Sequence, residues 1–164
     1  MALATIDLIR DVFSPSHEEV NGSPSTRALA TLRGELRGEL CLPSEAGYDE
    51  ARTIWNAMID RRPAAILRAA GASDVVATVR LAAQYGLLLS VRGGGHNIAG
   101  NAVCDGGLML DLSRMKSVQV DSAARTALVG PGALLSDLDR VLLTECILQP
   151  NPLTAAREFR NRWR

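Results

Sequence analysis

The feature that most constrains this chain is a ten-residue segment, 91–100, which holds four glycines and one of the two histidines of the sequence. The apolar run 87–91 leads directly into it. Glycine reaches positive φ values without steric cost and leaves its backbone N–H open to a close ligand. Consecutive amides in such a loop form a concave nest that holds an anion. Spacing alone favours two interpretations equally: a phosphate-binding loop, or a tight turn with a hydrogen-bonded histidine.

The loop matches neither of two well-known phosphate-binding motifs. The dinucleotide fingerprint needs a glycine three residues after Gly95, where Ile98 stands. The phosphate loop needs Lys-Ser or Lys-Thr after Gly100, where residues 101–102 are Asn-Ala. If this loop contacts a phosphate, it does so through a motif other than these two.

The segments before the loop predict a strand-helix-strand unit. Residues 64–67 form an apolar strand, and Gly86 is placed to end the helix that follows it. That helix is predicted to be capped at Ser73-Asp74, and its apolar side consists of Val75, Val76, Val79, Ala82 and Ala83. The strand 87–91 is almost continuously apolar, which predicts cover on both faces. A right-handed crossover of this kind puts the glycine loop at the carboxyl end of a strand, where ligands of α/β sheets bind.

Two helices are predicted ahead of this unit. The first begins at Ser23-Pro24, ends at Pro43, and has a stripe formed by Leu29, Leu32, Leu36 and Leu40. The second has the helical stripe Ala51, Ile54, Trp55, Met58 and Ile59. Within that stripe we interpret Trp55 as a packing residue, not as a binding residue.

After the loop the hydrophobic period changes to two, which is typical of strands. The alternating segments are 108–112, 118–120 and 126–129, with a turn at 121–124, and a last amphipathic helix covers 134–142. The predicted fold class is α+β. A β-α-β unit is followed by a small antiparallel sheet and a helix, and two helices precede it.

Composition excludes several classes of protein. The chain of 164 residues is 47% apolar with 18 basic and 18 acidic side chains, which indicates one globular domain that binds no nucleic acid. No apolar run approaches a membrane span, and the first ten residues lack the basic leader of a signal peptide. The chain has an odd number of cysteines, Cys41, Cys104 and Cys146, and their spacing is not that of metal ligands. They predict free thiols in a reducing, cytoplasmic compartment and no metal site.

Several ordered sequence blocks carry a resemblance to a known family. The blocks are 60–64, 73–76, 91–97, 103–107 with 110–113, and 130–133 with 138–140. In this order they resemble the PCMH-type FAD-binding domain of the vanillyl-alcohol oxidase superfamily. The similarity is greatest to bacterial members of the berberine-bridge-enzyme-like (BBE-like) branch of FAD-linked oxidases. Several blocks in one order are far more specific than a single glycine loop.

The resemblance implies FAD as the cofactor and assigns residues to it. The loop whose amides receive the FAD pyrophosphate corresponds to Gly93, Gly94, Gly95, Asn97 and Gly100. Arg92 adds charge there or turns its side chain to solvent. His96 matches the histidine that bonds covalently to the flavin 8α-methyl carbon, a reaction that needs a neutral imidazole nitrogen as nucleophile.

The resemblance ends near residue 140, whereas the family continues into a second FAD-binding segment and a substrate domain. We therefore expect a helical lead-in at 1–60, a partial FAD-binding domain at 61–144 and an aberrant, disordered tail at 145–164, produced by a shifted or prematurely ended reading frame. The expected function is that of an FAD-linked oxidoreductase that passes a hydride from a small-molecule substrate to flavin, without catalytic residues or activity in this chain alone. A stand-alone flavin-binding module and a nonfunctional remnant stay open as alternatives.

Overall fold

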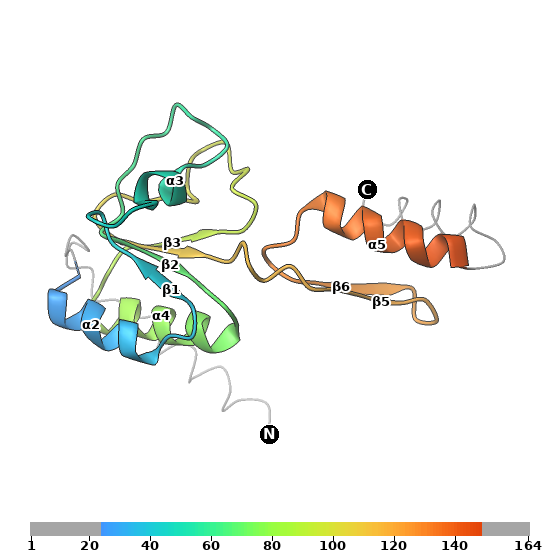
Figure 1. Cartoon of the computed structure of the whole chain (residues 1–164), viewed down its shortest axis with the longest axis horizontal. Helices are drawn as coiled ribbons and strands as arrows, with labels where there is room; N and C mark the ends of the chain where they lie inside the picture. The colour runs from blue at the N-terminus through green and yellow to red at the C-terminus, as the bar shows by residue number, and fades with distance from the viewer. Residues whose placement is uncertain (1–23, 149–164) are drawn as a thin grey trace, which may run out of the picture.

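A computed structural model describes residues 24–148 of the protein, which form a four-stranded sheet, a two-stranded hairpin and four helices (Figure 1). The sheet has the order β1-β2-β4-β3, with β1 at Glu39–Cys41, β2 at Ala65–Arg68, β3 at Leu89–Arg92 and β4 at Leu108–Asp111. The hairpin consists of β5 at Val118–Asp121 and β6 at Thr126–Val129. The helices are α2 at Thr26–Glu35, α3 at Tyr48–Arg52, α4 at Ala72–Gln84 and α5 at Leu135–Leu148.

The predicted crossover unit is confirmed, since β2 leads through α4 to β3 and both strands run in the same direction. Strand β4 lies between them and is parallel to each. The segment 108–112 therefore belongs to the centre of the main sheet, and its assignment to the antiparallel set was wrong. Only the hairpin and the edge strand β1 pair in antiparallel fashion within the described chain.

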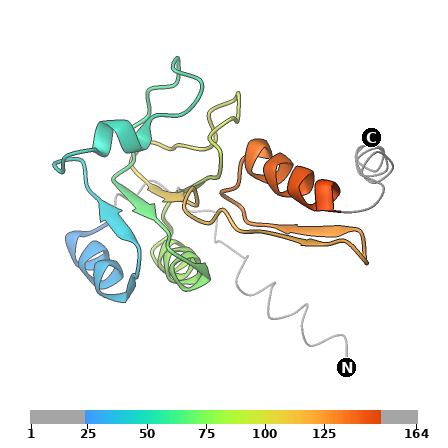
Figure 2. The same cartoon turned by 45° about the vertical axis from the view of Figure 1, so that its right-hand side comes forward.

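Helices cover the sheet on both faces, and the alternation of β2 and β4 supplies two separate cores (Figures 1 and 2). Leu67, Leu108 and Leu110 pack with α2 and α4 on one face. Ile66 and Met109 point to the other face, where α3 and the chain around residue 103 cover them. A period of two thus predicts a strand correctly here, but both of its faces are apolar and buried.

Strand β3 departs from its prediction because it is the edge of the sheet and is not covered on both faces. The side chain of Val91 is 49% exposed. An apolar run does not show which strand is central, and β4 takes that place. In α4, Val76 and Val79 are exposed while Asp74 and Thr78 are buried, so the predicted apolar side was partly wrong.

The first helix is shorter than predicted, because α2 ends at Glu35 and β1 follows where the helix was expected to continue. Its N-cap is Ser25, whose Oγ accepts a hydrogen bond from Ala28 N at 3.2 Å. At Gly38 the chain passes so close to the carbonyl oxygen of Arg68 that a Cβ atom would overlap it. This close approach lets β1 pair with β2, and helix periodicity could not reveal it.

The second helix is only the five-residue α3, and tertiary hydrogen bonds explain why it stops. In a continuing helix Trp55 N would donate to Ala51 O. Instead Arg92 Nη1 donates to Ala51 O at 2.7 Å, and Trp55 N donates to Gly95 O at 3.2 Å. Trp55 is 65% exposed and Met58 91% exposed, so the packing role predicted for Trp55 was wrong.

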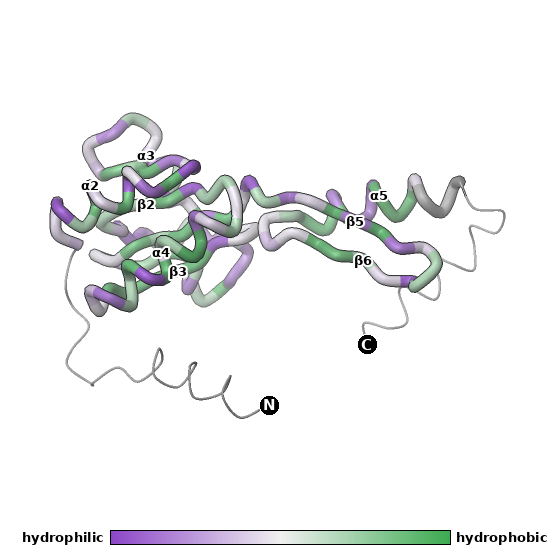
Figure 3. Tube along the Cα trace, turned by 90° about the horizontal axis from the view of Figure 1, so that it is seen from below, coloured by the Kyte–Doolittle hydropathy of each residue, from purple (hydrophilic) through white to green (hydrophobic). Residues whose placement is uncertain are grey.

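The hairpin and the start of the last helix were predicted correctly, and α5 packs against β5. The helix continues to Leu148 and so includes residues 145–148, which were expected to begin a disordered tail. Together they extend away from the main sheet, and apolar residues of β6 and α5 remain at the surface (Figure 3). Residues 1–23, which include His17, and the tail 149–164 lie outside the described part of the chain. No described helix has the length and apolar character needed to cross a membrane.

Candidate functional site

The glycine loop leaves the carboxyl end of β3, as predicted, and carries a row of backbone N–H groups, of which that of Gly95 belongs to a buried residue. Among the described residues, none accepts a hydrogen bond from the N–H groups of Gly93, Gly94, Gly95 or His96. Gly95 has a φ of +74°, a conformation that favours glycine. Successive unpaired amides around a positive-φ glycine form the kind of nest that receives an anion.

A second loop closes over the first and leaves no room for a side chain. A Cβ atom on Gly93 would lie 2.5 Å from Pro131 O, and one on Gly94 would lie 3.0 Å from Leu134 Cδ2. Gly132 in turn lies against the Leu112 carbonyl, where a Cβ atom would also overlap. The approach of the loop after β6 to the loop after β3 therefore depends on glycine on both sides.

The side chain of Arg92 has a structural role. The sequence suggested that it adds charge at the loop or turns to solvent, and neither option describes its contacts fully. Its guanidinium donates to Asp111 Oδ2 at 2.9 Å and to the carbonyl oxygens of Ala51 and Thr53. Asp111 is fully buried and also accepts from Ser113 N at 2.9 Å. A buried carboxylate needs such a cation and such donors to remain charged. Arg92 thus ties α3 and β4 to the base of the glycine loop, and Asp111 balances its charge.

His96 lies exposed beside the indole of Trp55, with the two ring centroids 5.9 Å apart and the planes at 29°. Since Trp55 N is also bound to Gly95 O, the backbone and the ring of this residue both hold the loop. Aromatic pairs in this distance range attract each other beyond simple burial. The exposed Trp55 therefore restricts the orientation of the imidazole.

Asn97 and Gly100 shape the second half of the loop. Asn97 Oδ1 accepts from Asn101 N at 3.0 Å, and its carbonyl accepts from Gly100 N at 3.1 Å. Gly100 has a φ of +76° and is packed against the side chain of Ile59. These contacts fix the turn that ends the segment.

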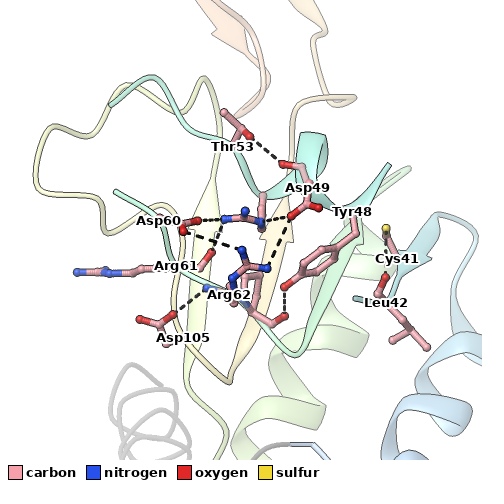
Figure 4. A network of polar contacts seen from close by, with 11 residues as sticks. Cys41, Leu42, Tyr48, Asp49, Thr53, Asp60, Arg61, Arg62 and Asp105 are labelled. Carbon is pink, nitrogen blue, oxygen red and sulfur yellow. Dashed lines mark hydrogen bonds and ion pairs between the residues drawn. The ribbon is translucent and has the colours of Figure 1, made fainter. Parts of the chain in front are cut away.

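A polar network anchors the far end of the loop to the chain before β2 (Figure 4). Arg61 Nη1 donates to Gly100 O and to Val103 O, each at 3.1 Å. Arg62 N donates to Asp105 Oδ1 at 2.7 Å, and the guanidinium of Arg52 pairs with Asp49 and Asp60. Residues 93–100 are thus held at their start by Arg92 and at their end by Arg61.

The loop opens into a cavity of about 270 Å³. Of the predicted site residues, only Arg92 and the glycines 93–95 line it, while His96, Asn97 and Gly100 do not. The prediction missed the rest of the wall, which is formed by Glu50, Thr53, Ile54, Trp55, Ser113, Lys116, Gly132 and Leu134. The Gly-Pro-Gly segment 130–132 was the available signal, since it belongs to one of the sequence blocks. Nothing in the local sequence marked Lys116.

Neither thiol with a described side chain lines this cavity. Cys41 is buried, and burial, more than the neighbouring charges, raises the pKa of its thiol. Cys104 is buried and donates to Leu108 O at 3.3 Å. No group of His, Cys, Asp and Glu suited to a metal ion occurs among residues 24–148.

Comparison with known proteins identifies the family. The sequence profile described as "FAD binding domain" matches residues 63–157. The chain belongs to this family. FAD is therefore its cofactor, and the relatives it matches are FAD-linked oxidoreductases and oxidases.

Three relatives show the extent of the similarity. The chain is 42% identical to (R)-6-hydroxynicotine oxidase of Paenarthrobacter nicotinovorans over 63% of its own length and 22% of that protein. It is 28% identical to BBE-like 1 of Physcomitrella patens, with a TM-score of 0.67 over 72% of this chain and 26% of the other. It is also 28% identical to xylooligosaccharide oxidase from Myceliophthora thermophila, with a TM-score of 0.64 over 72% of this chain and 25% of the other. The chain spans about a quarter of the length of each of these relatives.

The residues of this FAD-binding domain fit a pyrophosphate at the glycine loop. The four unpaired amides at 93–96 supply donors, and the absence of Cβ atoms lets the backbone come close. The fold confirms the PCMH-type FAD-binding domain of the BBE-like oxidases expected from the sequence.

Proposed function

We propose that the loop 93–100 binds the pyrophosphate of FAD and that His96 carries the flavin covalently. The observation that carries this proposal is the row of unpaired N–H groups at 93–96 beside the cavity. Charge-assisted hydrogen bonds from such amides to phosphate oxygens are stronger than bonds between neutral groups. No side chain of residues 93–95 covers these amides, and the contacts of Asn97 and Gly100 hold the turn that follows them.

Arg92 acts indirectly in this proposal. Its contacts with Asp111 and with two carbonyls fix the backbone from which the glycines start, so its role is to position the loop. A direct salt bridge to a phosphate is not required of it, because Asp111 already balances its charge at 2.9 Å.

In the proposed attachment, a ring nitrogen of His96 would lose its proton and form a bond to the flavin 8α carbon in place of a C–H bond. This is a two-electron oxidation, and the bound flavin would take up the two electrons and pass them to dioxygen. The exposed position of His96 at the start of a fixed turn supports this role, and so does the indole of Trp55, which limits the rotation of the imidazole. A nucleophile held in one orientation loses less entropy on reaction.

The wider activity we propose is that of an FAD-linked oxidase, in which bound flavin accepts a hydride from a small-molecule substrate. Its support is the family of the relatives. We assign no catalytic residue to this chain. We propose that it binds FAD without turnover by itself, and that the substrate contacts correspond to the parts of the relatives it does not cover.

The test is to express the chain with FAD and to measure its intact mass and its visible spectrum after denaturation. We expect a mass increase of one FAD with flavin absorbance retained by the denatured protein. His96→Ala should abolish this covalent increase, whereas His17→Ala, which changes the other histidine, should not.

Two results would contradict the proposal in different ways. Unmodified wild-type protein that still binds FAD reversibly would remove the covalent role of His96 and leave the pyrophosphate site. A folded chain that binds no FAD at all would reject the site itself.

A further inference from the structure

The cavity beside the glycine loop holds one basic side chain that is not committed to a protein carboxylate. Lys116 is the only lysine of the sequence, and it lines the cavity together with Ser113, Gly132 and the glycines 93–95. Among the described side chains, none forms an ion pair with Lys116. Its ammonium group is thus available to a ligand.

The other charges at the cavity do not favour an anion. Arg92 is 15% exposed and Asp111 compensates its charge. Glu50 lines the cavity and adds a negative charge. Of the charged side chains that line the cavity, Glu50 and Arg92 have opposite signs, so Lys116 supplies the net positive charge that attracts a diphosphate.

The nearby start of α5 does not supply the missing charge. Helix N-termini attract anions through unpaired N–H groups, but Asp137 Oδ2 already accepts from Leu134 N at 3.0 Å. This bond lowers the pKa of Asp137 most. Burial, the second-largest cause, opposes it, and the charges of Lys116 and Arg140 lower the pKa further. Lys116 is thus close enough to influence Asp137 without forming a salt bridge to it.

We propose that Lys116 neutralises the pyrophosphate of FAD in the cavity that it lines together with the glycines 93–95, and that it selects phosphate-bearing flavin over phosphate-free flavin. This inference rests on the proposed function. A lysine suits this role because its ammonium is a compact point charge on a flexible stem, which serves phosphate without a fixed geometry. The amides would then orient the pyrophosphate, and Lys116 would supply the long-range attraction.

The test measures the affinities for FAD and for riboflavin by isothermal titration calorimetry. His96→Ala is the background for every variant, so that binding stays reversible. We expect Lys116→Gln to weaken FAD binding about tenfold, as for the loss of one charge-assisted contact at a partly exposed site. Riboflavin has no phosphate, so its affinity should not change, and Lys116→Arg should retain most of the affinity for FAD.

Arg114→Gln is the matched control. Arg114 lies two residues earlier, carries the same charge and pairs with Glu39 Oε2 at 2.7 Å outside the cavity. Its loss should leave both affinities unchanged. The FAD affinity should also fall with added salt more steeply in the background protein than in the Lys116→Gln variant, because salt screens the lost charge pair.

Circular dichroism must show that each variant is folded. Equal FAD affinity with and without Lys116 would overturn the inference and leave the proposed function intact. An equal loss for FAD and riboflavin would also overturn it, since the lysine would then support the cavity instead of the phosphates. If the His96→Ala background binds no FAD, the amide site of the proposed function fails and this inference fails with it.

Discussion

The sheet region (residues 24–112) and the hairpin region (residues 113–148) differ in how they bury their apolar residues. Among residues 24–144, for which burial is described, every buried hydrophobic residue belongs to the sheet region. In the hairpin region Leu128 is 71% exposed and Leu135 is 80% exposed. The sheet has helices on both faces, whereas the two-stranded hairpin packs mainly against α5. A two-stranded hairpin is marginal in water without further cover, so we infer that the sheet region carries most of the stability.

The cavity joins the two regions, which makes this difference relevant to function. Arg92 and the glycines belong to the sheet region, while Lys116, Gly132 and Leu134 belong to the hairpin region. The stable part therefore presents the backbone donors, and the less stable part supplies the second wall. A ligand that contacts both walls stabilises the arrangement in which they face each other.

Removal of Asp111 should have the largest effect, because it leaves Arg92 without its partner at the base of the loop. We expect Asp111→Ala to lower the free energy of unfolding by about 4 kcal/mol, as for breaking a buried ion pair. Urea denaturation followed by circular dichroism measures it. The double variant Arg92→Met with Asp111→Leu should recover part of the loss, since no buried charge is then unpaired. A loss below about 1 kcal/mol in the single variant would mean that the pair is well hydrated.

Two leucines in strands compare the regions directly. Leu110 in β4 is 1% exposed, and Leu128 in β6 is 71% exposed. We expect Leu110→Ala to cost about 3 kcal/mol through the cavity it leaves, and Leu128→Ala to cost less than about 0.5 kcal/mol. Urea denaturation of both variants, followed by circular dichroism, measures the two losses in the free energy of unfolding. Similar losses for both variants would show that the apolar surface of the hairpin region is covered in solution.

Periodicity predicted the elements whose pattern is local and failed where distant residues decide. The crossover unit, the hairpin and α5 followed from apolar spacing and turn residues. Strand β1 was missed because its leucine, Leu40, also continues a helical stripe, and only the close approach at Gly38 shows the strand. The early end of α3 depends on Arg92, which lies about forty residues further along the chain. Tertiary contacts override local preference in both places.

In the candidate site, too, the local sequence predicted one part and distant contacts decide the other. The glycine loop was visible in the sequence because four glycines directly after an apolar run indicate a backbone that leaves the strand in a conformation other residues avoid. The opposite wall comes from Ser113, Lys116 and Gly132, which become neighbours of the loop only after β4 is placed beside β3. A single lysine gives no pattern, and an exposed tryptophan is indistinguishable in sequence from a buried one. The resemblance could supply ligand chemistry, but the geometry of this wall required the fold.

The smallest expected effects come from two aspartates, one in each region. They test whether the two regions unfold together. Asp74 is fully buried; burial raises the pKa of its carboxyl, but hydrogen bonds from the amides of Arg37, Ala70, Gly38 and Gly71 outweigh burial and lower it below the ordinary 3.8. Asp137 also has a lowered pKa, chiefly because of the amide of Leu134 at the start of α5. Stability from a depressed carboxyl pKa is present above the unfolded pKa and is lost as pH falls through the folded pKa.

Asp74→Asn should therefore cost about 1 kcal/mol at pH 7, and its difference from wild type should shrink as pH falls below 3.8. Asp137→Asn should leave the main urea transition unchanged and only accelerate amide hydrogen exchange at the start of α5, since local openings there do not involve the sheet. Titrations at several pH values and exchange measured by mass spectrometry separate the two effects. If Asp137→Asn shifts the main transition as much as Asp74→Asn does, the hairpin region unfolds together with the sheet region. The difference in burial between the two regions would then not make them unfold separately.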